Sequence, residues 1–374
     1  MRFEKTNLLL EGNKKIHYNK DYIEEYKHWL NTFLKDMDFM KNIDFASRVM
    51  FSTEIKSNNT IEGIYDDIEY IEEVIAKNKD DVKRIINLYQ GYKYILTHES
   101  INKESLKELY AILSDSLLTK YDLQCMGEYY RNDIVYIFST NNFDNPYLGI
   151  EPNKINYYMD ILFDYINNFK VESEIDNFLK SQIMHFYFVY IHPYFDVNGR
   201  CSRTLSMWYL LNNKLYPYLI FNRAISFKRN KYINRIITTR NHGDITLFLE
   251  YMLKGVHNEL EKEYILYNLN SNLNYNLTKE ELQILKYMLS MNSNVTIKDL
   301  VTTYNRFNKH QRLDTLYYNK IKELIDKNII VLLQETKTNL IDNNKNYFIG
   351  INPDLLTIDY SNFTYLEPKK YIKK

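Results

Sequence analysis

The chain has 374 residues, which is long enough for two or three domains and a sizeable hydrophobic core. Its 48 lysines and arginines balance its 48 aspartates and glutamates, which excludes a general electrostatic attraction to nucleic acid or membranes. The two cysteines, Cys125 and Cys201, form no CxxC pair, the sequence shows no secretory signal, and polar residues interrupt every apolar run. We therefore expect a cytoplasmic protein without membrane-spanning helices.

Apolar residues at helical spacing predict a largely helical N-terminal region. One helix is expected at about 20–37, and three more between residues 66 and 120, the last beginning at Asn102 or Lys103. These helices carry no visible chemistry. The segment EIKSNNTIEGI, residues 54–64, ends in Glu62 and Gly63. Glycine suits a helix C-cap, which would leave Glu62 in the last turn.

The sequence changes character at residues 127–138, GEYYRNDIVYIF, where residues alternate as in a short strand or hairpin. Exposed strand edges can bind extended peptides. The alternative is a connecting hairpin that binds no partner. An amphipathic helix is expected to follow from about Asn153.

The most informative segment is HPYFDVNGRCSR, His192 to Arg203, because it places a polar loop between two apolar, aromatic segments. Pro193 ends the first helix, and His192 beside it is a candidate general base. Asp196 is a hard oxygen ligand of the kind that Mg²⁺ accepts when water and phosphate complete its shell.

The second helix of this pair begins with Asn198, Gly199 and Arg200, whose free amides and positive dipole end form an anion site. Arg200 and Arg203 lie three residues apart, so both guanidinium groups can face one anion. This pattern favours a magnesium-bound polyphosphate attacked by a hydroxyl. The alternative, a core histidine with arginines capping helices, leaves the density of polar groups unexplained.

The segment resembles the active-site motif of the Fic family of nucleotidyltransferases, HxFx(D/E)GNGRxxR, whose members transfer AMP from ATP to Ser, Thr or Tyr hydroxyls of proteins. Six positions agree with the family. The resemblance implies that His192 deprotonates the target hydroxyl and that Asp196 holds Mg²⁺. It also implies which residues surround ATP: the α and β phosphates would lie on Asn198, Gly199 and Arg200, with Val197 beside them, and the γ phosphate on Arg203.

Two residues depart from the family pattern. Tyr194 replaces the usual Phe, a mild change if the ring only packs beneath the loop. Val197 replaces the usual Gly, and a β-branched residue would be strained if that backbone needs a positive φ. We expect this second departure to affect the level of activity.

In many Fic proteins an upstream helix carries (S/T)xxxE(G/N), and its Glu pairs with the last Arg of the motif where the γ phosphate would lie. Glu62 and Gly63 match the end of this pattern, while Asn58 stands at the Ser/Thr position. The resemblance therefore makes about 50–63 an inhibitory helix. A charge-assisted pair between Glu62 and Arg203 would contribute about 1.5–3 kcal/mol. The alternative is an ordinary solvated glutamate before a cap.

The resemblance also makes about 127–138 the flap, a hairpin that pairs with a target segment. Gly127, Tyr130 and Arg131 fit the usual GxYR with one additional residue, and Ile134 and Val135 would lie along the docking edge. After the motif, the positions that hold the base and a closing helix correspond to Tyr232, Arg240 and Asp244. Tyr232 could stack on adenine or simply pack.

Residues 259–276 are polar and Asn-rich, which predicts a helix end and a linker. Residues 277–374 resemble a winged-helix domain, with three helices and two β-like runs around a turn at 342–346. Helix starts are expected at Thr278, with Glu281 in a capping box, and at Thr296. The third helix, about 312–327, has only a slight excess of cations, which favours protein interaction or dimerisation over DNA binding.

We therefore expect a mainly α protein with a helical region at 1–95, a Fic core with a small β-hairpin flap at 96–258, and the C-terminal module. Its expected function is transfer of AMP from ATP, with Mg²⁺, to protein hydroxyls including its own, inhibited by Glu62. Three alternatives remain: another Fic chemistry, such as phosphotransfer or removal of AMP; a DNA-binding regulator with a degenerate Fic core; and a toxin-like role.

Overall fold

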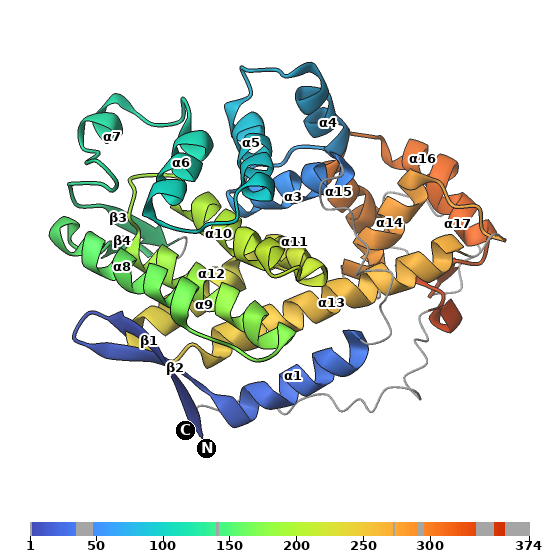
Figure 1. The fold of residues 1–374 in the computed structure, drawn as a ribbon. Helices are drawn as coiled ribbons and strands as arrows, with labels where there is room; N and C mark the ends of the chain where they lie inside the picture. The colour runs from blue at the N-terminus through green and yellow to red at the C-terminus, as the bar shows by residue number, and fades with distance from the viewer. Residues whose placement is uncertain are drawn as a thin grey trace. The chain divides into compact units, whose positions relative to one another are not determined.

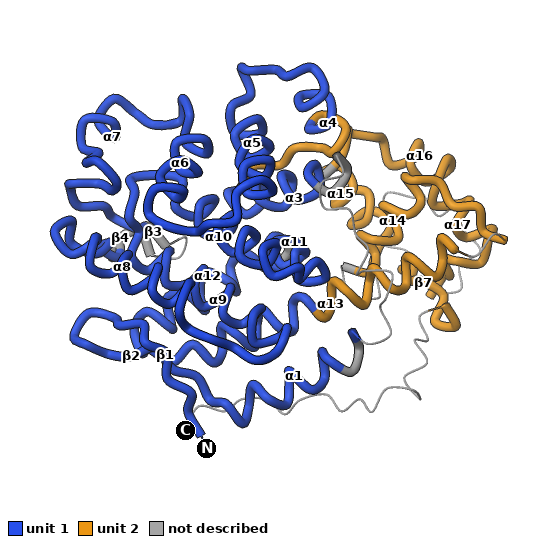
Figure 2. The backbone as a smooth tube through the Cα atoms, in the orientation of Figure 1, with its two compact units in different colours: residues 1–62, 71–256, 366–374 blue, residues 63–70, 257–365 orange. Residues whose placement is uncertain are grey.

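The computed structural model describes residues 2–34, 48–139, 142–271, 274–290, 295–333 and 348–355. The protein is mainly helical with small antiparallel hairpins, as expected (Figure 1). It divides into two compact units, one formed mostly by residues 1–62 and 71–256 and the other by 63–70 and 257–365 (Figure 2). Across the described ranges, the helices are too short or too polar to span a bilayer.

The first unit opens with a hairpin that the sequence analysis missed. Strands β1 (Phe3–Leu10) and β2 (Lys14–Asn19) pair antiparallel, and helix α1 (Lys20–Leu34) follows at once. The alternation of Thr6, Leu8 and Leu10, which are all buried, was the available signal. This alternation covers only a few residues beside a longer helical pattern, so it is a weak signal for a strand.

The helices expected between residues 66 and 120 are present. They are α4 (Ile68–Lys77), α5 (Lys83–Thr97) and α6 (Lys103–Ser114), preceded by α3 (Arg48–Ile61) and followed by the short α7 (Lys120–Gln124). Asn102 caps α6, because its Oδ1 accepts a hydrogen bond from the Ser105 amide at 2.9 Å. Gly63 has φ +86° just beyond α3, which confirms its expected place at that helix end.

The β-hairpin of the flap region lies further along the chain than expected. Strands β3 (Tyr136–Ser139) and β4 (Asn142–Leu148) pair antiparallel, with Tyr136 opposite Leu148, while residues 127–133 are irregular apart from an isolated bridge between Met126 and Arg131. The expected hairpin at 127–138 is therefore corrected to 136–148. Helix α8 (Pro152–Asn168) follows, close to its predicted start.

The core of the first unit is built around α9 (Glu174–Ile191) and α10 (Asn198–Asn212). Almost every side chain of both helices is buried, as their apolar, aromatic sequences predict. Helix α10 packs against α9, α5 and α6 (Figure 1). The chain continues through a 3₁₀ turn (Tyr216–Ile220), α11 (Phe221–Phe227), α12 (Arg229–His242) and α13 (Thr246–Ser271).

The expected linker at 259–276 is only partly correct. Helix α13 continues to Ser271 because Leu260, Ile265 and Leu269 recur at helical spacing and are buried. The asparagines in this stretch obscured that pattern.

The second unit alternates helices with short strands. After α13 come α14 (Lys279–Ser290), β5 (Val295–Thr296) and α15 (Ile297–Phe307). The next helix begins as α16 (Leu313–Leu316), passes through a π turn (Tyr317–Ile321) and continues as α17 (Lys322–Asp326). The last elements are β6 (Ile330–Leu332), β7 (Phe348–Ile351) and a 3₁₀ turn (Pro353–Leu355). The sheet order is β5-β7-β6. The capping box is confirmed, since Thr278 and Glu281 exchange backbone-to-side-chain hydrogen bonds. The expected turn at 342–346 lies outside the described residues.

Candidate active site

The loop between α9 and α10 is closed by the side chain of Asn198. Its Oδ1 accepts a hydrogen bond from the Tyr194 amide at 3.0 Å, and its Nδ2 donates to the Tyr194 carbonyl at 2.8 Å. The Tyr194 ring is fully buried and stacks on Tyr110 with centroids 3.5 Å apart. Tyr194 thus packs beneath the loop, as expected for a mild replacement of Phe. Because the Asn198 amide is occupied, only its backbone N–H remains for an anion.

Arg131 holds the same loop from outside. Its Nε donates to the His192 carbonyl at 2.8 Å, its Nη2 donates to the Ile150 carbonyl at 2.5 Å, and its backbone N–H donates to the Pro193 carbonyl at 3.0 Å. Arg131 is 2% exposed, and Tyr130 is also buried. The expectation that these two residues dock a target is therefore corrected, because a buried side chain that braces the loop presents no surface.

The exposed part of the flap region begins beyond Arg131. Ile134 is 53% exposed and Val135 is half-buried, so these two expected docking residues do face solvent in part. Tyr136 and Leu148, which pair across the hairpin, are exposed as well. Exposed apolar side chains beside a strand can contact the side chains of a peptide whose backbone pairs with the strand edge.

His192 ends α9 with a left-handed backbone, at φ 54° and ψ 61°. Its Nδ1 lies 3.3 Å from the Val189 carbonyl oxygen, which can only accept, so Nδ1 carries the proton and Nε2 has the free lone pair. Burial lowers the pKa of His192 to about 4, with the charges of Arg131 and Arg240 acting in the same direction. The imidazole is therefore neutral at neutral pH and can accept a proton at Nε2.

The N-terminus of α10 offers the free amides of Asn198, Gly199 and Arg200. Val197 stands before them at φ 65° and ψ 5°, and it makes no side-chain cap to the helix. A left-handed backbone strains a β-branched residue, so the departure noted in the sequence coincides with a strained position. Arg200 Nη1 is buried without a hydrogen-bond partner among the described residues, which is the state expected of a group that awaits an anion.

One residue of the loop fits a divalent cation. Asp196 is exposed, and its Oδ1 accepts a hydrogen bond from the Val197 amide at 2.6 Å, which orients the carboxylate. No group of three or more His, Cys, Asp or Glu side chains with metal-binding geometry occurs in the described ranges. A cation here would therefore take Asp196 as a protein ligand and complete its shell with water and phosphate oxygens, as Mg²⁺ does.

Arg203 is almost fully buried and meets two residues near the end of α3. Its Nη2 lies 2.5 Å from Glu62 Oε1, and its Nε and Nη2 donate to Asn58 Oδ1 at 2.9 and 2.7 Å. Burial opposes ionisation of Glu62, but the charges of Arg203, Arg200 and Arg229 outweigh it and lower the pKa of the carboxyl. Glu62 is therefore a carboxylate, and its side chain keeps one third of its surface exposed.

Two residues at this contact were missed as site residues. Asn58 was noticed only as a departure from the Ser/Thr pattern, and that position was the available signal. Arg229 of α12 donates from Nε to the Ile61 carbonyl at the end of α3. Nothing in the local sequence of Arg229 pointed to this contact, because its partner lies far away in the chain.

A cavity of about 260 Å³ unites most of these groups. Seven of the predicted site residues line it: Glu62, His192, Asp196, Asn198, Gly199, Arg203 and Tyr232. Arg200, Val197 and the four predicted flap residues do not line it. An apolar wall comes from the hairpin and α12, formed by Ile137, Tyr147, Ile233, Ile236 and Ile237.

Tyr232 and its neighbours in the sequence have distinct roles. The Tyr232 ring lines the cavity, and its hydroxyl lies 2.6 Å from His185 Nε2. Arg240 donates to the Tyr190 carbonyl at 3.2 Å, and Asp244 Oδ1 accepts from the Thr246 amide at 3.0 Å. Neither Arg240 nor Asp244 lines the cavity: Arg240 holds the end of α9, and Asp244 caps the start of α13.

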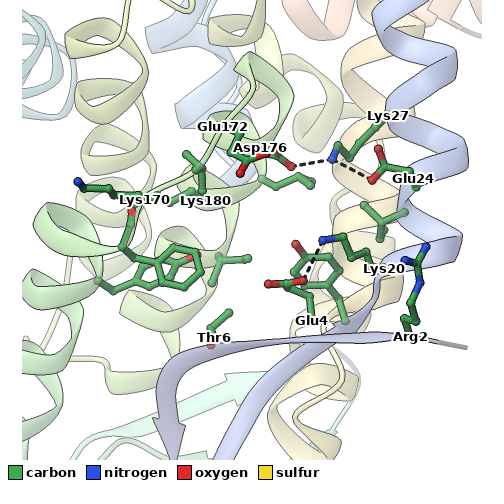
Figure 3. Close-up of a pocket in the computed structure, with 17 residues that line it drawn as sticks. Arg2, Glu4, Thr6, Lys20, Glu24, Lys27, Lys170, Glu172, Asp176 and Lys180 are labelled. Carbon is green, nitrogen blue, oxygen red and sulfur yellow. Dashed lines mark hydrogen bonds and ion pairs between the residues drawn. The ribbon is translucent and has the colours of Figure 1, made fainter.

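A second cavity of about 400 Å³ lies elsewhere in the first unit, between the β1–β2 hairpin and helices α1, α8 and α9 (Figure 3). No residue of the motif lines it. Its carboxylates Glu24 and Asp176 both pair with Lys27, at 2.9 and 2.8 Å, and Glu4 pairs with Lys20 at 3.2 Å. Because these charges are already neutralised, we place the chemistry in the smaller cavity.

Comparison with known proteins agrees with this geometry. Residues 100–210 match the model of the Fic/DOC family, and this stretch contains α6 to α9, the whole loop and most of α10. The fold is similar to a Fic family protein from Desulfovibrio desulfuricans G20, with TM-score 0.54 and 16% identity over 89% of this chain and 96% of that one. It is also similar to Fic-1 from C. elegans, with TM-score 0.50 and 15% identity over 67% and 74%.

The chain therefore carries a Fic/DOC family domain. At these identities the solved structures show the fold alone. Domains of this family generally transfer AMP or other nucleotide-derived groups to proteins, and they are generally transferases.

Proposed function

We propose that the protein is an adenylyltransferase that transfers AMP from ATP, with Mg²⁺, to Ser, Thr or Tyr hydroxyls of proteins, including its own. We further propose that Glu62 holds this activity in check. The observation that carries the proposal is the 2.5 Å contact between Glu62 and Arg203 at the wall of the cavity. It brings a carboxylate to the guanidinium where the neutral His192 and the free amides of α10 converge.

In this reaction His192 Nε2 takes the proton of the target hydroxyl as its oxygen forms a bond to the α phosphorus. The bond from the α phosphorus to the bridging oxygen of pyrophosphate breaks, and pyrophosphate leaves with the electron pair. The backbone amides of Gly199 and Arg200 would face the negative charge. The Arg200 guanidinium does not line the cavity, but its charge acts on Glu62 and would also act on nearby phosphates. Asp196 would hold a Mg²⁺ ion, and a bound Mg²⁺ would add to the neutralisation of the phosphate charge.

Inhibition follows from competition between two anions for one cation. Glu62 Oε1 pairs with Arg203, and a Cβ placed on Gly199 would lie 2.9 Å from that oxygen. The carboxylate therefore lies against the backbone that would receive the phosphates. A γ phosphate at Arg203 would approach the Glu62 charge, and the repulsion would keep ATP from a productive position.

The test is intact mass after incubation with ATP and Mg²⁺. We expect AMP adducts on Glu62→Gly, few on the wild type, and none on the double variant Glu62→Gly, His192→Ala. Glu62→Gln is the matched control, since it keeps the shape of the side chain and removes its charge, and we expect it to be active. Equal adduct levels on wild type and Glu62→Gly would overturn the inhibitory role, and adducts on the double variant would overturn the role of His192.

A second candidate function is supported by the strained backbone at Val197. It is a DNA-binding regulator with a weakly active Fic domain.

The same cavity could also support another Fic chemistry, such as phosphotransfer or removal of AMP. Product analysis separates these two chemistries from AMP transfer: a mass increase of one phosphate, or loss of AMP from a modified protein, would replace AMP transfer as the proposed reaction.

We also propose that the second unit is a winged-helix module. The order of helices and strands and the β5-β7-β6 sheet support this reading. Two of its cations near the third helix already pair with carboxylates, Arg312 with Asp314 and Lys320 with Glu280, both at 3.4 Å. This pairing favours protein interaction or homodimerisation over DNA binding. A gel shift with random-sequence DNA that weakens with salt would reverse that preference.

A further inference from the structure

Helix α3, which leads to Glu62, is polar and yet buried. From Phe51 to Ile61 every residue except Thr53 is buried, and both Glu54 and Asn58 are fully so. A helix that served only as a removable plug would be expected to turn its polar side to solvent. Instead, two of its polar side chains are paired inside the unit: Glu54 lies 3.3 Å from Arg223 Nε, and Asn58 accepts hydrogen bonds from Arg203. The helix is built as part of the core.

Asn58 of α3 forms two hydrogen bonds to the Arg203 guanidinium. Its Oδ1 accepts hydrogen bonds from both Nε and Nη2 of the guanidinium. An arginine has donors only, so the oxygen of the amide must face it. The Nδ2 group then points away and donates to the Tyr92 hydroxyl of α5 at 3.1 Å. Tyr92 is fully buried, so the amide is held from both sides.

Asn58 and Glu62 have different electrostatic effects on the same guanidinium. Both orient it, but the Glu62 carboxylate also cancels its charge, whereas the neutral amide of Asn58 does not. When the Glu62 carboxylate turns away, Arg203 keeps its place and its full positive charge. A buried cation held in this way is prepared for an incoming phosphate.

We propose that Asn58 is a positioning residue for Arg203, and that α3 is a permanent part of the phosphate site. In this mechanism α3 stays in place when inhibition is relieved, and only the Glu62 side chain moves. Glu62 lies just beyond Ile61, where α3 ends, and its side chain is 33% exposed, so it can rotate into solvent without disturbing the helix. This inference rests on the proposed function, because it needs a γ phosphate at Arg203.

The two views of α3 predict opposite effects for Asn58→Ala. If α3 were a removable plug, losing Asn58 would loosen it and activate the protein, as Glu62→Gly does. If Asn58 positions Arg203, the substitution does not activate the wild type, and it weakens ATP binding in the Glu62→Gly background. Asn58→Asp is a second, isosteric variant. An aspartate can still accept hydrogen bonds from Arg203, but its negative charge permanently cancels the positive charge of the guanidinium. Asn58→Asp should therefore also weaken ATP binding.

The experiment is calorimetric titration of the Glu62→Gly protein, alone and combined with Asn58→Ala, Asn58→Asp or Tyr92→Phe, with Mg·ATP and with Mg·ADP. ADP lacks the γ phosphate and reports whether the cavity is intact. We expect both Asn58 variants to raise the Kd for ATP at least tenfold and to change the Kd for ADP less than twofold. Tyr92→Phe should have a smaller effect in the same direction. Ser57→Ala, on the same helix but bonded to the Thr53 carbonyl, should change neither Kd.

The outcomes separate this inference from the proposed function. If the Glu62→Gly protein binds no ATP, the proposed function itself fails. If it binds ATP and the Asn58 variants bind it equally well, or if Asn58→Ala alone forms AMP adducts like Glu62→Gly, the positioning role is wrong. Equal losses of ATP and ADP binding would show a merely structural role and would also overturn it.

Discussion

The strain at Val197 can be measured by replacing it with Ala and with Gly. The backbone there has φ 65° and ψ 5°, and the side chain is 3% exposed. Both substitutions remove buried methyl groups, so both should destabilise the protein relative to the wild type by roughly 1–3 kcal/mol. They differ in the energy of the backbone: Ala keeps the cost of a left-handed conformation, which is about 1–2 kcal/mol, and Gly does not.

The difference in stability between the two variants measures the free-energy cost of the left-handed backbone at position 197. In an ordinary helix interior Gly is less stable than Ala by about 0.5–1 kcal/mol, because it loses more conformational entropy on folding. At Val197 the relief of strain outweighs that loss, so we expect the Gly variant to be more stable than the Ala variant by about 0.5–1 kcal/mol. The difference in stability between Gly and Ala at this position thus has the opposite sign to that in an ordinary helix interior.

The assay is urea unfolding of both variants, with the same pair made at Asp160, an exposed position in α8, as the control. At Asp160 the Ala variant should be more stable by about 1 kcal/mol. If Ala is also more stable than Gly at Val197, the left-handed conformation is not strained. The Gly variant combined with Glu62→Gly should also form AMP adducts faster than Glu62→Gly alone, if strain at the anion site limits activity.

Two pH predictions follow from buried bases. Burial lowers the pKa of His192 to about 4. Adduct formation by the Glu62→Gly protein should therefore show no loss attributable to His192 between pH 8 and pH 5. A half-maximal rate near pH 6.5, the ordinary pKa of histidine, would contradict the neutral, buried base. Lys180 donates to the Ile166 and Phe169 carbonyls, and burial lowers its pKa to about 8. Between pH 8 and about 10.5 the unfolded chain therefore binds more protons at Lys180 than the folded protein does. The free energy of unfolding of the wild type should rise through that window relative to Lys180→Met, by up to about 3 kcal/mol. Parallel pH profiles of unfolding for the two proteins would refute this.

The local sequence determined those features whose physics is local. Thr278 and Asn102 begin helices because a side-chain oxygen can cap the amides three residues ahead, and the caps formed where expected. The segment from His192 to Arg203 was recognisable for the same reason, since a base, an oxygen ligand and free amides lie close together in the sequence between two buried helices. The apolar character of α9 and α10 also followed directly from their composition.

Only the tertiary structure decided which partners the buried polar groups would have. Arg203 is 145 residues from Asn58 in sequence, and Arg131 is 61 residues from His192. Sequence reasoning placed Arg131 on an exposed flap because nothing local marks it as buried. A guanidinium carries several donors, and burial forces it to find acceptors wherever the fold brings them. That requirement turned Arg131 into a brace and Asn58 into a support for Arg203, and it is a property of the packed core that no short segment contains.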